Sequence, residues 1–246
     1  MVVGDLMLYS SVDNKKIKDI KKLNQKKYRD IENLFLVEGE HLVLEANKCG
    51  YLENIILLDG ESFPIEKNNI YVTDKVLNYI TELDSHQKVI GICHKLEEKS
   101  IGNRVLILDD IQDPGNLGTI IRSAVAFNID TLILSENTVD LYNSKVIRAS
   151  QGLIFRLNII KRDIRDTIKE LKELNYDIIG TKVDDGVDIK AIKTSNFALI
   201  MGNEGNGVHD DVLNLCTHYA HIKMNDTCES LNVGVATSIM LYELNK

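Results

Sequence analysis

The second half of the chain alternates short apolar runs with helical patterns, and this alternation constrains the fold more than any other feature. The runs RVLILDD, TLILS, GLIFRLNII, YDIIGT, FALIMG and AHIKM are typical of strands buried on both faces. Helical patterns are expected at residues 117–127, at 163–175 and at the C-terminus. Such strands and helices predict a parallel sheet covered on both sides. Ligands bind such sheets beyond the carboxyl ends of the strands, so the loops there are the candidate sites.

The sequence pattern of the first half of the chain predicts a smaller α/β unit. NLFLVEGEHLVLEANKCG indicates a strand and then a helix from about Glu40 that ends at Gly50. NIILLDG and KVIGICHKL are typical of strands, and NIYVTDKVLNYITEL of a strand and a helix capped near Thr73. The polar segment EEKSIGNR is typical of a linker. We therefore predict two domains, at residues 1–98 and 104–246.

The composition indicates a globular protein without a membrane span. Hydrophobic residues make up 44% of the 246 and charged residues 27%, as in ordinary soluble domains. No apolar run reaches the ~18 residues of a span, and the N-terminus lacks the basic start and cleavage site of a signal peptide. The four cysteines form no C-x-x-C pair, so we expect a cytoplasmic protein without a disulfide framework.

A zinc site is the less favoured interpretation of four residues near the C-terminus. Two of them, His218 and His221, would point to opposite faces of a strand, so ordinary packing is favoured and no metal is expected. The set is Cys216, His218, His221 and Cys228.

The charge of the chain is distributed unevenly. The net charge is −8, which argues against a nucleic-acid partner, but residues 14–29 hold eight basic side chains and one acid, Asp19. Ile17, Ile20 and Leu23 form an apolar stripe at helical spacing within that stretch. This basic arm is either a solvated helix face or a contact with a phosphate backbone.

The first candidate loop, LDDIQDPGNLGTIIRSAVAF, joins a strand to a helix. Asn116 is expected at the helix cap, and Gly118 and Arg122, four residues apart, share a face that an anion or a sugar could approach. The alternative is a capped helix with a solvated arginine. The carboxylates before the helix could hold magnesium, although acids are commoner as turn formers; they are Asp109, Asp110 and Asp113.

The second candidate loop, LIMGNEGNGVHDDVL, carries clustered glycines after a buried strand. Such glycines indicate close approach to the backbone. A dinucleotide-binding loop would have the order G-x-G-x-x-G and an acid ~20 residues later. Here the order is G-x-x-G-x-G, and the residue twenty after Gly202 is Ile222, so a dinucleotide enzyme is disfavoured. Glu204 is either part of a polar site or a turn acid.

The third candidate loop opens the C-terminal helix with a polar group, ESLN. Ser230, Leu231 and Asn232 precede an apolar helix that runs to the end of the chain. An ordinary N-cap explains such an entry, and so does a cofactor or substrate site.

These three loops, in this order, resemble the three signature motifs of the SpoU (TrmH-like) branch of the SPOUT methyltransferases. The second motif, a strand followed by G-x-E-G, matches residues 202–205, and the third, S-L-N-V-x-V-A, matches 230–236 except that Gly234 stands where the family often has serine. The segment FLVEGEHLVLEA resembles the substrate-binding domain that often precedes this catalytic domain. The first motif, N-x-G-x-x-x-R-x-A, matches Asn116, Gly118, Arg122 and Ala124.

The resemblance implies an α/β fold with a C-terminal trefoil-knotted SPOUT domain and a small N-terminal RNA substrate-binding domain. It also implies a homodimer whose active site draws on both subunits, with S-adenosylmethionine as cofactor. Main-chain groups at Gly202, Ile222 and Leu231 would hold the adenosine. The residues matching the family's catalytic positions are Arg122, Asn116, Glu204, Ser230 and Asn232.

The activity that the resemblance implies is ribose 2′-O-methylation of RNA. Ribosomal RNA, of the 23S type, is favoured because a separate domain precedes the catalytic one. Transfer RNA is the alternative substrate, and a catalytically inactive RNA-binding protein of the same fold is the alternative function. The intact Arg122, Glu204 and Asn232 argue against the inactive alternative.

Overall fold

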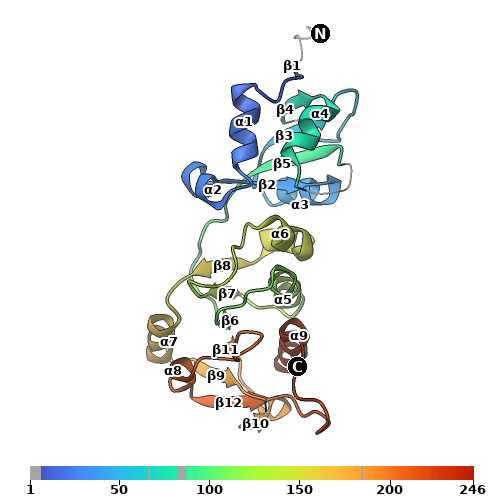
Figure 1. The fold of residues 1–246 in the computed structure, drawn as a ribbon. Coiled ribbons are helices and arrows are strands. Elements are labelled where there is room, and N and C mark those ends of the chain that lie inside the picture. The colour runs from blue at the N-terminus through green and yellow to red at the C-terminus, as the bar shows by residue number, and fades with distance from the viewer. Residues whose placement is uncertain (1–6, 66, 83–86, 184) are drawn as a thin grey trace. The chain divides into compact units, whose positions relative to one another are not determined.

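Two separate β-sheets organise the chain, which the computed structural model describes at residues 7–65, 67–82, 87–183 and 185–246 (Figure 1). One compact unit contains the described residues up to Leu96 together with the segment Tyr142–Phe155. The other contains Glu97–Leu141 and Arg156–Lys246. Each sheet belongs to one unit, and all the candidate site residues lie in the second unit.

The first unit is built on a mixed five-stranded sheet. The strand order is β1-β4-β3-β5-β2, in which β4 pairs in parallel with β1 and β3, and β5 pairs antiparallel with β2 and β3. Its strands are β1 (Leu8–Tyr9), β2 (Leu34–Glu38), β3 (Leu52–Leu58), β4 (Asn68–Val72) and β5 (Val89–His94). Its helices are α1 (Lys15–Lys22), α2 (Lys26–Glu32), α3 (Glu40–Lys48), α4 (Asp74–Ile80) and α6 (Ser144–Ser150).

The basic stretch 14–29 forms two helices that are part of this unit. Asn14 caps α1 by accepting from the amide of Lys16, and the helix ends before α2 begins at Lys26. The predicted stripe of Ile17, Ile20 and Leu23 is buried in the core against the sheet. The stretch is therefore an integral part of the fold, with its lysines outward, and it is not a detached arm.

The second unit is built on an all-parallel seven-stranded sheet, as the apolar runs predict. The order is β10-β12-β9-β11-β6-β7-β8, and each neighbouring pair is parallel. The strands are β6 (Arg104–Leu108), β7 (Thr131–Leu134), β8 (Asn158–Lys161), β9 (Asp177–Thr181), β10 (Val187–Asp188), β11 (Phe197–Met201) and β12 (His218–His221).

Helices cover both faces of this sheet. In Figure 1, α5 and α9 lie on one side, and α7 and α8 lie on the other. Alternate strand residues such as Val105, Ile107 and Ile200 pack in one core cluster with α7 and α8, because successive side chains of a strand point to opposite faces. The helices are α5 (Pro114–Ala126), α7 (Ile164–Glu173), α8 (Asp210–Leu213) and α9 (Val233–Leu244).

Two local predictions were wrong. The expected strand at 152–160 begins only at Asn158, because Gln151 and Gly152 have positive φ angles that end α6, and a 3₁₀ turn follows. The cap of α5 is Asp113, whose carboxylate accepts from the amide of Asn116 at 2.8 Å, and a proline occupies the first turn. Asn116 is therefore inside the first turn, and its side chain is left to bond elsewhere.

Candidate functional site

A chain of side-chain hydrogen bonds joins all three candidate loops. The Nδ2 amide of Asn116 donates to Glu204 Oε1 at 2.9 Å, and the Nδ2 amide of Asn232 donates to Asn116 Oδ1 at 2.9 Å. The side-chain oxygen of Asn232 caps α9 by accepting from the amides of Gly234 and Val235 at 3.0 and 3.3 Å. The structure thus brings together one predicted site residue from each loop.

Parallel pairing of β6 with β11 explains why two of these loops meet. Their carboxyl ends lie at the same edge of the sheet, so the loop after Leu108 and the loop after Met201 are neighbours. The third loop is brought in by α9, which packs against α5. That contact is close: Ser123 and Ser238 hydroxyls are 2.6 Å apart, and a β-carbon at Gly234 would lie 3.2 Å from Thr119.

Glu204 is held as a carboxylate by the loop that it faces. Its two oxygens accept from the main-chain amides of Gln112 and Asp113 at 3.2 and 3.1 Å, in addition to Asn116. Partial burial acts to raise the pKa of Glu204, but the hydrogen bonds from Asn116 and the main chain outweigh it and hold the pKa below its ordinary value. Glu204 is thus an anchoring anion at neutral pH.

The glycines of the second loop serve the loop's own backbone. Asn203 and Gly207 exchange main-chain hydrogen bonds of 2.9 and 3.0 Å, which folds the loop back on itself. A β-carbon at Gly202 would lie 2.0 Å from the carbonyl carbon of Gly207, and Gly207 itself has a φ of +70°. The close approach predicted from the glycines is therefore, at Gly202, an approach of the loop to itself.

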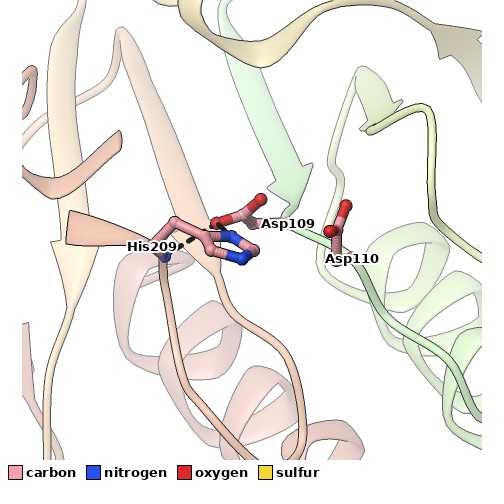
Figure 2. A group of neighbouring side chains, drawn as sticks. All are labelled: Asp109, Asp110 and His209. Atoms are coloured by element: carbon pink, nitrogen blue, oxygen red, sulfur yellow. Dashed lines mark hydrogen bonds and ion pairs between the residues drawn. The ribbon is translucent and has the colours of Figure 1, made fainter. Parts of the chain in front are cut away.

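A buried carboxylate ties the end of this loop to β6. Asp109, which is 4% exposed, accepts from both the main-chain amide and Nδ1 of His209 through Oδ2, each at 2.9 Å. Figure 2 shows the His209 imidazole facing this carboxylate. The hydrogen bond and the charge of Asp109 raise the pKa of His209, and the charges of Asp110 and Asp211 add to the effect.

In the described residues, one group of three side chains could hold a metal ion. It consists of Asp109, Asp110 and His209. One ligand atom from each lies within 4.8 Å of the others. However, Asp109 is engaged by His209, and Asp110 accepts from Ser135 at 2.6 Å and Asn137 at 3.2 Å. These bonds account for the cluster as a loop tether. The zinc set considered from the sequence is not among the three-residue ligand groups of the described chain.

Arg122 and Ser230 stand outside the hydrogen-bond chain. Both are exposed, and neither side chain has a hydrogen bond or ion pair within the described part of the chain. Arg122 lies six residues beyond Asn116 on α5, roughly 9 Å along the helix axis. Gly118 is buried, so the open face predicted beside Arg122 does not include it.

The three residues predicted to hold a cofactor have main-chain groups that are not used in main-chain hydrogen bonds within the described chain. Gly202 is buried after β11, Ile222 is half-buried after β12, and Leu231 is half-buried before α9. None of the three makes a main-chain hydrogen bond to another described residue. Unpaired amides and carbonyls near the carboxyl edge of a parallel sheet suit recognition of a nucleoside's donors and acceptors.

Sequence reasoning missed two residues that build the site. Asn203 donates from Nδ2 to the Asp110 carbonyl at 2.8 Å and accepts from the amide of Gly205 at 2.9 Å. His209 forms the tether to Asp109. The sequence could have indicated Asn203, since asparagine is common in turns where a side chain forms hydrogen bonds with nearby backbone. The sequence could not have indicated His209, because its partner Asp109 lies 100 residues earlier.

Comparison with known proteins assigns the family. The profile of the SpoU rRNA Methylase family matches residues 103–242, and that of the MRM3-like substrate binding domain matches residues 14–91. The chain belongs to the SpoU rRNA methylase family. One SpoU relative is the 23S rRNA (guanosine(2553)-2′-O)-methyltransferase RlmP of Bacillus subtilis (strain 168), with 37% identity over 95% of this chain and 97% of that protein.

Solved structures of methyltransferases have the same fold. The AdoMet-bound rRNA methyltransferase from Sinorhizobium meliloti superposes with a TM-score of 0.85 at 30% identity, covering 98% of this chain and 97% of that one. AviRb, the SpoU methyltransferase from Streptomyces viridochromogenes solved with AdoMet, has a TM-score of 0.83 at 21% identity, covering 94% and 96%. The predicted α/β class and the N-terminal substrate-binding domain are confirmed.

Proposed function

We propose that this chain transfers the methyl group of S-adenosylmethionine to a ribose 2′-hydroxyl of ribosomal RNA. The observation that carries the proposal is the hydrogen-bond chain from Glu204 through Asn116 to Asn232. It links one residue from each signature motif and so fixes the three loops relative to one another. The similarity to RlmP over nearly the full length of both chains supports 23S ribosomal RNA as the substrate.

The loops after β11 and β12 would hold the cofactor. When bound, S-adenosylmethionine supplies a methyl group on a sulfonium that is already a strong electrophile. The spare main-chain groups of Gly202, Ile222 and Leu231 would pair with the adenosine edge. The tether between Asp109 and His209 keeps the loop that starts at Gly202 in place.

Arg122 would act on the RNA. A guanidinium resists deprotonation, so it is unsuited to take the hydroxyl proton. Its planar fork can instead hold a phosphate next to the ribose and stabilise negative charge that develops on the 2′-oxygen. Its exposure and its lack of a partner among the described residues leave it available for this contact. Ser230, which is also exposed, would orient the hydroxyl.

A homodimer would complete the site. Val235 and Tyr242 on α9 are 48% and 52% exposed, and with half-buried Ile239 they follow helical spacing along one face. Phe127, directly after α5, packs edge-on against Tyr242 at 5.8 Å between ring centroids. A second copy laid on this face would bury these side chains. In a site that draws on both subunits, as the family resemblance implies, Arg122 would serve the partner's cofactor site.

The rest of the proposal follows from the family. The second unit would contain the trefoil knot, with domain boundaries at residues 98 and 104, and the first would bind RNA. Ribosomal RNA as substrate implies the cytoplasm. In the described chain, no helix combines the length and the apolar character needed to cross a bilayer.

Methyl transfer to ribosomal RNA tests the proposal. Purified protein, labelled S-adenosylmethionine and a 23S transcript should give labelled RNA. Arg122→Ala should reduce the rate ~100–1,000-fold, as expected for loss of one charge-stabilising donor. Its melting temperature should barely change, since exposed positions usually contribute within ~0.5 kcal/mol. Arg162→Ala, which removes an exposed arginine paired with Glu170, is the matched control and should retain activity. Equal rates for all three proteins would refute the role of Arg122.

A further inference from the structure

A groove of about 680 Å³ crosses the first unit, remote in sequence from the signature motifs. It is lined by residues of α1 and α2 and of the strands β1, β2, β3 and β5. Its volume falls within the ~300–1,000 Å³ typical of ligand pockets. The buried or half-buried part of its lining is mostly apolar and includes Ile20, Leu23, Leu34 and Ile92.

Two half-buried tyrosines line the groove, and each has a lysine ammonium over its ring in a cation–π contact. Lys16 Nζ lies 5.4 Å from the ring centroid of Tyr9, and Lys22 Nζ lies 5.5 Å from that of Tyr28. Lys27 lies near the same Tyr28 ring, at 5.8 Å. Flat rings beside ammonium groups offer a stacking surface and an anion contact within the reach of one ligand.

The charge around the groove favours an anion. Lys15, Lys16 and Lys22 line it. Two acids also line the groove: Asp19, which is paired with Lys22 at 2.8 Å, and Glu32. The Lys15 ammonium has no hydrogen bond or ion pair within the described residues. The lining thus holds three lysines against two carboxylates, a small positive excess in a chain whose net charge is −8.

Large apolar side chains are exposed at the same place. Met7 is 69% exposed and Ile31 is 63% exposed, and both line the groove. A solvated basic helix face requires neither an apolar hollow nor exposed aliphatic groups beside it. Their combination with lysines and tyrosines matches a ligand that is flat and apolar on one side and anionic on the other.

We propose that this groove binds an unpaired stretch of the RNA substrate, with bases stacked on Tyr9 and Tyr28 and phosphates on the adjacent lysines. The inference rests on the proposed function for the identity of the polymer as RNA. It adds the form in which the first unit takes the substrate, namely a single strand. A duplex hides the faces of its bases, so it can reach the lysines but cannot stack on the rings.

Tyrosine fluorescence tests this binding directly, because the chain has nine tyrosines and no tryptophan. The full-length protein is titrated with a single-stranded oligouridylate and, separately, with an RNA duplex of equal length. Quenching is expected with the single strand. Tyr28→Leu should weaken single-strand binding about tenfold and leave duplex binding unchanged, as loss of one stacked base implies. Tyr28→Phe, which keeps the ring, should bind like the original protein.

Tyr79 provides the matched control. It is 36% exposed and lies beneath Lys21 at 5.6 Å, but it does not line the groove. Tyr79→Leu should therefore bind the single strand normally. Equal affinities of Tyr28→Leu and Tyr79→Leu would overturn the proposal. Equal weakening of single-strand and duplex binding by Tyr28→Leu would also overturn it, because it would show a surface that reads phosphates alone.

This test is separate from the test of the proposed function. Oligouridylate binding needs no methyl transfer, so a groove that binds single strands in a protein without methyltransferase activity would refute the activity and retain the groove. Conversely, if the protein methylates 23S RNA and Tyr28→Leu leaves KM for that RNA unchanged, the groove has no part in substrate binding. The proposal predicts a raised KM with kcat preserved.

Discussion

The side-chain amide of Asn232 donates to the side-chain oxygen of Asn116 across 2.9 Å, although 116 residues separate the two in the sequence. This bond fixes the orientation of both amides. Asn116 must turn its oxygen toward Asn232 and its nitrogen toward Glu204, and Asn232 must turn its oxygen toward the amides that open α9. The polar entry of the C-terminal helix is therefore both a cap and a link to the other two motifs.

Asn116 is the central residue of this series of hydrogen bonds, and replacing it with the isosteric aspartate should break the series. Asn116→Asp places a carboxylate at hydrogen-bonding distance from that of Glu204, and two such charges repel. We expect a lower melting temperature at pH 7, partly recovered at mildly acidic pH as one carboxyl takes up a proton, and loss of cofactor affinity. Asn143→Asp is the control, since Asn143 caps α6 through Lys145, and aspartate caps equally well. If both variants have the same melting temperature, the hydrogen bonds of Asn116 do not contribute to the stability of the fold.

The tether between His209 and Asp109 predicts a pH dependence with a definite sign. Asp109 raises the pKa of His209 in the folded protein above its unfolded value of ~6.5. The stabilisation from the charged histidine is therefore fully present below pH ~6.5 and is lost as the pH rises through the folded pKa. His209→Gln should lower the melting temperature most at low pH, with the deficit shrinking at alkaline pH.

The control for this pH dependence is His218→Gln. His218 is exposed and bonds to the hydroxyl of Thr217, with no carboxylate among its hydrogen-bond partners. Its replacement should leave the pH profile of melting unchanged. A His209→Gln deficit that is constant from acid to alkaline pH would show that the tether works through hydrogen bonding alone.

Mixing two inactive variants tests whether the active site is shared between subunits. Arg122→Ala would lack the RNA contact, and Leu231→Asp would place a charge in the proposed cofactor pocket and abolish cofactor binding. In a mixed dimer with shared sites, one site carries both defects and the other is intact, so activity should return. If each subunit builds its own site, no mixture regains activity, and the proposed role of α9 as the dimer face loses its functional support.

The sequence predicted the elements well because the local signals were strong. Buried apolar runs predicted most strands of the parallel sheet, and the glycine order disfavoured a dinucleotide loop. It could not predict which side chains meet, because the bonds among Glu204, Asn116 and Asn232 depend on the strand order β11-β6 and on the packing of α9 against α5.

Other features had no local signal at all. The segment Tyr142–Phe155 lies with the first unit, where Tyr142 packs on Phe35 at 4.7 Å between ring centroids. The sequence predicted no helix in this segment, and nothing local in it indicates which sheet it joins. The domain boundaries, the knot, the dimer and the roles of individual site residues stay predictions.

Transfer to an RNA that lacks a single hydroxyl tests the central claim most directly. The methylated nucleotide is first located by mass spectrometry in a 23S fragment treated with the protein and S-adenosylmethionine. The same fragment is then made with a 2′-deoxynucleotide at that position alone. Ribose 2′-O-methylation predicts that methyl incorporation into the deoxy fragment falls to background while its binding affinity is retained. Undiminished incorporation at that nucleotide would show that the base is the acceptor and would contradict the account.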